Sequence, residues 1–439
     1  GRTKGAGGVE DVEASDTCLN SDRTQMELVG VQVLFRHGPR TPVFKFPDSE
    51  SVNWNLCQGL GPKGYPIKVI DMQSGGGQPP LAYGALRGVQ KSLKGGCYAG
   101  QLTDLGKNQA EALGLKLASR YSAIIQKISD NKDLLFVRST NFPRTIETAQ
   151  HVLGGMANPD WKHTIPVYTV HSDEELMVGT NTKACPRLLE VLNEGKRLYA
   201  QTAPDEVHRI RYELESKIGK KGVEVLRITK PGLWKGTDLI PTHDVLKCMM
   251  SHGMDLPSWA NETLGKDTHR IAGRQIGFVL QGDGKDAAFR TRVARLGIGR
   301  FLGLINENMY ARIQEIAEEK QGRPHPVPLL SLFSGHDTSI TPVLAAYGLY
   351  DDHWPPFCSS FAWELHRDLS DSSGSSSGFY VRVLYNFLPV TLPTESGRQG
   401  REFIPYEEFR EYTMGLTPQD FAQECACKKD ISKPGHGTF

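Results

Sequence analysis

One stretch of the sequence suggests both the fold and the place to look for a site. It is Val29-Gly30-Val31-Gln32-Val33-Leu34-Phe35, followed directly by Arg36-His37-Gly38-Pro39-Arg40-Thr41-Pro42. The first half is a short apolar run rich in β-branched residues, which predicts a buried strand. Residues just past the carboxyl end of a strand face the ligand crevice of an α/β sheet. The second half is therefore predicted to lie at a ligand site.

Two further apolar runs end in the same way. Residues 134–137 lead into Arg138-Ser139-Thr140, and residues 329–333 lead into Ser334-Gly335-His336-Asp337. Thr103 can cap a helix that comes before the second run. Its apolar residues repeat at spacings of four and three: Leu113, Leu117, Tyr121, Ile124 and Ile128. A further helix is predicted to start near Arg144. Strands and helices that alternate with short connections predict a parallel α/β sheet.

The remaining segments predict the domain organisation. Residues 42–100 are Gly/Pro-rich and irregular, and 158–290 are polar with helical patterns at 187–200 and 204–219. A long helix is predicted over 289–319, and alternating runs at 361–367 and 379–385 predict an antiparallel hairpin. We expect a flexible leader at 1–25, an α/β core built from 26–157 and 291–417, a mainly helical cap inserted at 158–290, and a tail at 418–439.

Composition excludes several classes of partner. The 439 residues carry 51 Lys and Arg against 50 Asp and Glu, a formal charge of +1, which argues against nucleic acid and anionic membrane surfaces. No apolar run approaches the roughly 18 residues of a transmembrane helix. The eight cysteines are compatible with buried thiols or with a few disulfides, and the oligomeric state stays open. Any site for an anion must therefore come from a local cluster of positive charge.

The segment after the first strand has the composition of such a cluster. Arg36 and Arg40 place two guanidinium groups on either side of the His37 imidazole, and many forked donors together favour a phosphate or a similar dianion. Taken alone, a surface arginine pair with a bystander histidine explains the motif equally well. Arg138 could form a structural salt bridge, and Asp337 could be a helix N-cap. Phosphate-compatible groups at all three strand ends favour the phosphate site.

The same residues resemble a known family. Arg36-His37-Gly38-x-Arg40-x-Pro42 with a distant His336-Asp337 resembles the histidine acid phosphatases, and the segments 93–103, 138–141 and 353–357 are similar to its lysophosphatidic acid phosphatase group. The resemblance covers about 26–417 and is strongest at 28–42, 93–148 and 329–366. It implies an α/β fold of the phosphoglycerate-mutase-like (histidine phosphatase) type, with a three-layer core and an inserted, mainly helical cap.

The resemblance also implies roles for the site residues. His37 is the expected nucleophile, which forms a phosphohistidine, and Asp337 is the expected general acid. Arg36, Arg40, Arg138 and His336 are expected to bind the phosphate oxygens. No metal or cofactor is expected, because the arginines supply the positive charge. A bound phosphate should raise the pKa of Asp337, which predicts an acidic rate optimum.

The residues themselves indicate only a phosphate monoester as substrate. The resemblance implies lysophosphatidic acid as the substrate, hydrolysed to monoacylglycerol. Resemblance to the lysophosphatidic acid phosphatase group implies a mitochondrial location, whereas the wider family is often lysosomal or secreted. Four aromatic residues are candidates for an apolar entrance, although each is more often a core residue: Tyr98, Trp54, Trp354 and Phe357. A phytase is also compatible with the sequence, because four lysines could surround the entrance: Lys45, Lys63, Lys68 and Lys94. A sugar-phosphate phosphatase and a non-catalytic phospho-ligand-binding protein are also compatible with the sequence.

Overall fold

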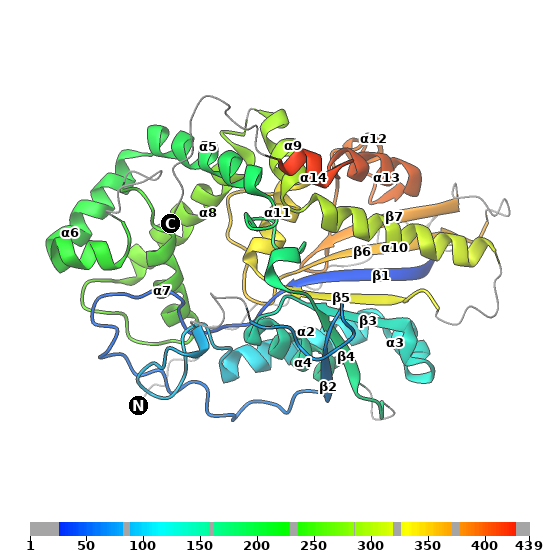
Figure 1. The fold of residues 1–439 in the computed structure, drawn as a ribbon, viewed down its shortest axis with the longest axis horizontal. Helices are drawn as coiled ribbons and strands as arrows, with labels where there is room; N and C mark the ends of the chain where they lie inside the picture. Colours follow the sequence, from blue (N-terminus) through cyan, green and yellow to red (C-terminus); the bar gives the residue numbers. More distant parts are fainter. Residues whose placement is uncertain are drawn as a thin grey trace, which may run out of the picture.

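A nine-stranded sheet forms the centre of the molecule (Figure 1). The computed structural model describes residues 26–81, 88–157, 161–228, 236–284, 286–318, 326–370 and 378–426, so the expected leader lies outside the described residues. The strands are β1 (Met26–Arg36), β2 (Ile67–Asp71), β3 (Leu135–Ser139), β4 (Ile165–Thr169), β5 (Leu330–Gly335), β6 (Ser360–Asp368), β7 (Phe379–Tyr385), β8 (Leu388–Val390) and β9 (Phe403–Pro405). Their order is β2-β4-β3-β5-β1-β6-β7-β8, and β9 pairs with β7.

The three strands predicted from the sequence lie side by side. β5 pairs in parallel with β1 on one side and with β3 on the other, which confirms the predicted parallel α/β sheet. Arg36 is level with Gly335, and Ser139 is level with Ser334, so the three strands end at the same edge. β6 and β7 form the predicted antiparallel hairpin. The segments that follow β1, β3 and β5 therefore meet at one edge of the sheet.

Helices cover both faces of the sheet and complete a three-layer core (Figure 1). β1 shows why both faces are apolar, because Val31, Val33 and Phe35 pack into one cluster while Leu34 packs into the other. The first cluster holds α2 (Asp104–Arg120), α3 (Ser122–Asp130) and α4 (Pro143–Met156). The second holds α9 (Ala287–Leu296), α10 (Gly299–Ala317), α11 (Asp337–Ala346) and α13 (Tyr406–Gly415).

Further helices lie beyond the carboxyl edge of the parallel strands (Figure 1). They are α5 (Pro186–Thr202), α6 (Asp205–Val225), α7 (Ile240–Ser251) and α8 (Glu262–Gln281). A third apolar cluster joins α6, α7 and α8 to Phe46 and Trp54 of the segment after β1. Two further α-helices among the described residues, α12 (Glu395–Arg398) and α14 (Phe421–Cys425), are short. None of the helices in the described ranges is both long and apolar enough to cross a membrane.

The structure differs from the predicted elements at several points. β2 lies in the segment 42–100 that was expected to be irregular, and β4 belongs to the sheet although it lies within 158–290. The first predicted helix is broken at Tyr121, and the helix predicted over 289–319 is broken at Gly297. In the expected tail, α14 is held to the start of α5 by the disulfide Cys185–Cys425; a second disulfide joins Cys57 and Cys97.

Candidate active site

The chain turns sharply at the end of β1 and places His37 over the sheet edge. The His37 backbone N–H donates to the Gly335 carbonyl at 3.0 Å, which ties the turn to the end of β5. Gly38 lies against the first turn of α2, where a Cβ atom would come within 2.5 Å of the Gly106 carbonyl oxygen. The Gly38 N–H donates to Thr148 Oγ1 of α4. Two helices and a neighbouring strand therefore fix the position of the imidazole.

A pocket of about 290 Å³ opens at this edge and brings together five of the six predicted site residues. Its charged and polar lining includes Arg36, His37, Arg40, Arg144, His243, Asp244, Lys247, His336 and Asp337. Its apolar lining is Val43, Phe44, Phe142, Val178, Ile240, Trp354 and Phe357. The pocket lining therefore combines cationic and apolar side chains.

The imidazole of His37 is arranged as a neutral group with one free nitrogen. The side chain is 1% exposed, and its Nδ1 lies 2.9 Å from the Gly38 carbonyl oxygen. A carbonyl only accepts, so Nδ1 carries the proton and Nε2 keeps its lone pair. Burial lowers the pKa of His37 well below its usual range, and the charges of Arg144, Arg40 and Arg36 lower it further. His37 therefore stays unprotonated at mildly acidic pH.

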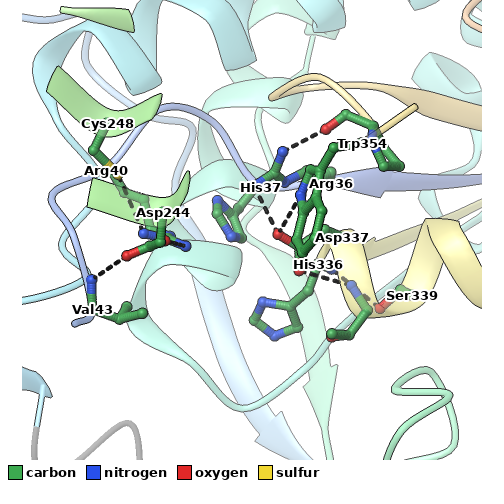
Figure 2. Close-up of polar contacts among 12 residues, drawn as sticks. Arg36, His37, Arg40, Val43, Asp244, Cys248, His336, Asp337, Ser339 and Trp354 are labelled. Atoms are coloured by element: carbon green, nitrogen blue, oxygen red, sulfur yellow. Dashed lines mark hydrogen bonds and ion pairs between the residues drawn. The ribbon is translucent and has the colours of Figure 1, made fainter. Parts of the chain in front are cut away.

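Asp337 begins α11 and lines the same pocket as His37, and Figure 2 shows its contacts with Arg36 and Trp354. Its Oδ2 accepts from Arg36 Nη2 at 2.8 Å and from Trp354 Nε1 at 3.2 Å, and its Oδ1 accepts from the Thr338 N–H at 2.8 Å. Burial would raise the pKa of Asp337, but the charges of Arg36 and Arg40 outweigh it and hold the pKa well below its usual range. Without bound phosphate the carboxyl group is ionised.

Arg40 is held by the helix α7 (Figure 2). Its Nη2 donates to Asp244 Oδ1 at 2.7 Å, and the other oxygen of Asp244 accepts from the Val43 N–H at 3.0 Å. Its Nη1 donates to the Thr41 carbonyl and lies 3.5 Å from Cys248 Sγ, a free thiol. Asp244 raises the pKa of Arg40 against the effect of burial, so this guanidinium remains charged.

His336 lines the pocket with both ring nitrogens in contact with protein groups. Nε2 lies 2.9 Å from Thr140 Oγ1, and Nδ1 lies 3.4 Å from Nη2 of Arg144. Because Arg144 only donates, Nδ1 is the accepting nitrogen and Nε2 carries the proton. Burial and the charge of Arg144 lower the pKa of His336, so this imidazole is also neutral.

Arg138 does not lie with the other predicted residues, which corrects the expectation that it binds phosphate. Its guanidinium is 2% exposed and donates to Glu175 Oε1 at 3.2 Å. Side chains alternate along a strand, and Arg138 shares its face of β3 with Phe136, which packs into the cluster beneath α10. The structural salt bridge, which the sequence also allowed at this position, is the one observed.

Arg144 takes the place in the pocket that was expected for Arg138. It lies in the first turn of α4, directly after Pro143 and six residues past Arg138. Burial and the nearby Arg40 lower the pKa of Arg144 to about 9, and no carboxylate of the described residues pairs with it. The sequence signal was a proline at the start of a helix, which places the next residue at the same sheet edge.

The candidates for the pocket entrance divide in two. Trp354 and Phe357 line the pocket, and the Phe357 ring lies 4.2 Å from the Arg36 guanidinium carbon. Trp54 is fully buried in the cluster of α6, α7 and α8, and Tyr98 is not part of the lining. None of the four lysines that kept a phytase open, Lys45, Lys63, Lys68 and Lys94, lines the pocket. The lysine that does, Lys247 of α7, was not predicted.

Comparisons with known proteins agree with this arrangement. The family model of the histidine phosphatase superfamily (branch 2) matches residues 27–244 and 298–386. The chain is 26% identical over 383 residues to lysophosphatidic acid phosphatase type 6 of Homo sapiens, covering 86% of this chain and 81% of that protein. It is 27% identical over 407 residues to lysosomal acid phosphatase of Bos taurus, covering 90% and 79%.

The fold is also found among solved structures. A Bifidobacterium longum multiple inositol polyphosphate phosphatase, in complex with inositol hexasulfate, superposes with a TM-score of 0.58 and 11% identity, over 92% of this chain and 96% of that one. At this identity the likeness concerns the fold alone. The family match covers more than half of the residues, including Arg36, His37, Arg40, Arg144, His336 and Asp337 of the pocket. The chain therefore belongs to branch 2 of the histidine phosphatase superfamily and is a histidine acid phosphatase, a phosphoric monoester hydrolase.

Proposed function

We propose that this pocket hydrolyses phosphate monoesters through a phosphohistidine on His37. The observation that carries the proposal is a buried, neutral imidazole whose free Nε2 shares one pocket with three guanidinium groups and an acidic side chain. Arg36, Arg40 and Arg144 are the proposed phosphate-binding groups, with His336 beside them. Their charges stabilise the three non-bridging oxygens as the transition state forms.

In the first step, Nε2 of His37 attacks phosphorus in line with the leaving oxygen. The N–P bond forms while the bond from phosphorus to the ester oxygen breaks, and Asp337 gives its proton to the departing alkoxide. Asp337 is ionised in the free pocket, so it must gain a proton as the phosphate binds. A phosphate dianion offsets the arginine charges that hold the pKa of Asp337 down, which raises that pKa.

In the second step, a water molecule attacks the phosphorus of phosphohistidine. Asp337, now ionised, takes the proton from the water, and the electron pair of the N–P bond returns to Nε2. Inorganic phosphate leaves, and His37 is neutral again. The low pKa of His37 suits the first step, because a protonated imidazole has no lone pair for attack.

We propose lysophosphatidic acid as the substrate, with monoacylglycerol as the product. Two findings support this choice: relatives of this chain carry the name lysophosphatidic acid phosphatase type 6, and seven apolar side chains line the pocket beside the proposed phosphate-binding groups. The absence of Lys45, Lys63, Lys68 and Lys94 from the lining weakens the case for a phytase.

Two disulfides bear on where the enzyme works. The pairs Cys57–Cys97 and Cys185–Cys425 form and persist in oxidising compartments and are rare in reducing ones. They favour a lysosomal or secreted enzyme over a mitochondrial one.

The test is a comparison of wild type with His37→Ala and with His208→Ala, which changes a half-buried histidine of α6 far along the chain from the site. Release of phosphate from lysophosphatidic acid, glycerol 3-phosphate, phytate and an aryl phosphate is measured from pH 4 to 8. His37→Ala should lose activity by about 10³-fold or more, and acid-labile [³²P]phosphate on the protein should disappear with it. Retained turnover in His37→Ala would refute the phosphohistidine route, and a preference for phytate would refute the proposed substrate.

A further inference from the structure

Trp354 is an aromatic residue of the pocket that also makes a polar contact with the proposed acid. It lies in the loop between α11 and β6 and donates from Nε1 to Asp337 Oδ2 at 3.2 Å (Figure 2). The indole packs against His243 of α7, with ring centroids 5.0 Å apart. Its N–H therefore points at the carboxyl group while its ring contacts the helix on the other side.

The loop that carries Trp354 is held closely by α8. Tyr350 donates its hydroxyl to the Gly273 carbonyl at 2.9 Å. At Gly273 a Cβ atom would come within 1.9 Å of the Asp352 carbonyl oxygen, so only glycine allows this contact. Because both ends of the contact are backbone atoms, the loop has little room to move. The direction of the Trp354 N–H is therefore set by the fold.

The two oxygens of Asp337 differ in how many donors they meet. Among the described residues, Oδ2 accepts from both Arg36 Nη2 and Trp354 Nε1, whereas Oδ1 accepts only from the Thr338 N–H. A carboxylate oxygen has about two lone-pair sites, so Oδ2 is fully used and Oδ1 keeps one site open. A proton on Oδ2 would meet two N–H donors, which is unfavourable. Oδ1 is the oxygen that can carry a proton.

We propose that Trp354 is a positioning residue for the reaction, whose indole N–H holds Oδ2 of Asp337 as an acceptor and so assigns the transferred proton to Oδ1. The inference rests on the proposed function, since it concerns the acid of that reaction. In the first step the proton leaves Oδ1 for the ester oxygen as the P–O bond breaks. In the second step Oδ1 takes a proton from the attacking water as the N–P bond breaks.

Many other groups face this carboxyl group and share in setting its proton affinity. They are Arg36 at the end of β1, His37 and Arg40 after it, Arg144 of α4, His336 and Tyr350 on either side of α11, and His243, Asp244, Lys247 and Cys248 of α7. Replacing Trp354 by phenylalanine removes one N–H donor and changes none of these charges. The phenyl ring of phenylalanine can still pack against His243.

Trp354→Phe should therefore make the protonated form of Asp337 easier to reach. Glycerol 3-phosphate is the informative substrate, because its alkoxide leaving group needs a proton from the acid. The rate of single-turnover phosphorylation falls as pH rises, and the midpoint of that fall should move up by about one pH unit. Hydrolysis of the phosphohistidine needs ionised Asp337, so its rise with pH should also move up by about one unit. The two pH dependences, called here the two limbs, are measured by rapid quench and acid-labile [³²P]phosphate.

Trp161→Phe is the matched control, because it removes an indole donor that binds Ser129 Oγ at 2.9 Å outside the pocket lining. Its pH profiles should equal those of wild type. Trp354→Gln restores an N–H donor without the ring and should move both limbs back toward wild type, which keeps the test valid if the phenylalanine variant folds poorly. Unshifted limbs in Trp354→Phe would overturn the inference while leaving the proposed function intact. Absence of phosphohistidine in wild type would instead refute the proposed function.

Discussion

Two of the buried arginine–carboxylate pairs near the carboxyl edge of the sheet differ in the direction in which the pKa of the carboxyl group is shifted. In the pocket, Arg36 at the end of β1 donates to Asp337 at 2.8 Å; on the face beneath α10, Arg138 of β3 donates to Glu175 at 3.2 Å. Both arginines are 2–3% exposed. Yet burial raises the pKa of Glu175 despite Arg138, whereas Arg36 and Arg40 outweigh burial and lower the pKa of Asp337.

The difference lies in the number of cations around each carboxyl group. The charged lining of the pocket has Arg36, Arg40, Arg144 and Lys247 against Asp337 and Asp244, an excess of positive charge that suits a phosphate dianion. Glu175 has one direct arginine partner and also accepts from the Met177 N–H at 2.7 Å. That pair holds the segment leading to Val178 in the pocket wall. The first pair therefore lies in a pocket with an excess of positive charge, whereas the second supports a loop.

The largest expected effect is on Arg144, the pocket arginine without a carboxylate partner among the described residues. Arg144→Ala should lower kcat/KM by about 10³-fold, because one guanidinium is lost from the phosphate-binding set. The melting temperature should not fall, since the variant removes a like-charged neighbour of Arg40 and Arg36. Steady-state kinetics and thermal unfolding check both parts. A lower melting temperature with unchanged kcat/KM would show that Arg144 is structural.

Arg138→Ala should give the reverse result. Removing one partner of a buried pair leaves the Glu175 carboxylate without its cation, which should lower the free energy of unfolding by about 3 kcal/mol. At a temperature well below unfolding, kcat/KM should stay within a few-fold of wild type. Urea denaturation and kinetics on the same preparation check this. If kcat/KM instead fell as in Arg144→Ala at unchanged stability, Arg138 would be a phosphate ligand after all.

The opposite pKa directions of Asp337 and Glu175 predict opposite effects of pH on stability. A depressed carboxyl pKa gives stability that is present above the unfolded value, about 3.9 for Asp, and is lost as pH falls toward the folded value. A raised carboxyl pKa gives stability that is present below the unfolded value, about 4.3 for Glu, and is lost as pH rises through the folded value.

Asp337→Asn should therefore reduce the fall in the free energy of unfolding as pH drops below about 4. Glu175→Gln should reduce its fall as pH rises above about 4. The free energy of unfolding, measured in urea from pH 3 to 7, separates the two. Parallel curves for wild type and both variants would contradict the assigned pKa directions.

Much of this site follows from strand ends. β1, β3 and β5 are strongly apolar, and the parallel pairing that their spacing predicts brings Arg36, His37, Arg40, His336 and Asp337 to one pocket. The weaker strands β2 and β4 were missed, because β2 is only half-buried and β4 contains a proline. Neither has the continuous apolar run that marks the three central strands.

Arg138 and Arg144 show what strand ends alone cannot decide. Arg138 is the last residue but one of β3, and the period of two along a strand turns its side chain to the face of Phe136. Arg144 comes after the strand, where the direction depends on how α4 packs. The contact of Arg40 with Asp244 joins residues 204 positions apart, and no local pattern in the sequence marks such a pair.

The smallest effect in this comparison is expected at Asp244, the second carboxylate of the pocket. Asp244 accepts hydrogen bonds from Nη2 of Arg40 and from the Val43 N–H. It therefore both fixes the position of Arg40 and offsets part of its charge. Asp244→Asn keeps the shape and removes the charge, which should lower kcat by about 10-fold as Arg40 loses its fixed orientation. Inorganic phosphate should inhibit more tightly, by about 3-fold, because the pocket gains one net positive charge.

A merely structural role for Asp244 would give a different result, in which phosphate binds more weakly as kcat falls. Lys217→Met, which breaks an exposed ion pair with Glu213 on α6, is a suitable control and should change neither constant. Tighter phosphate inhibition together with slower turnover would mean that this pocket uses its two carboxylates differently from Glu175. In that case Asp337 exchanges protons and Asp244 orients an arginine, whereas the Arg138–Glu175 pair beneath α10 serves stability.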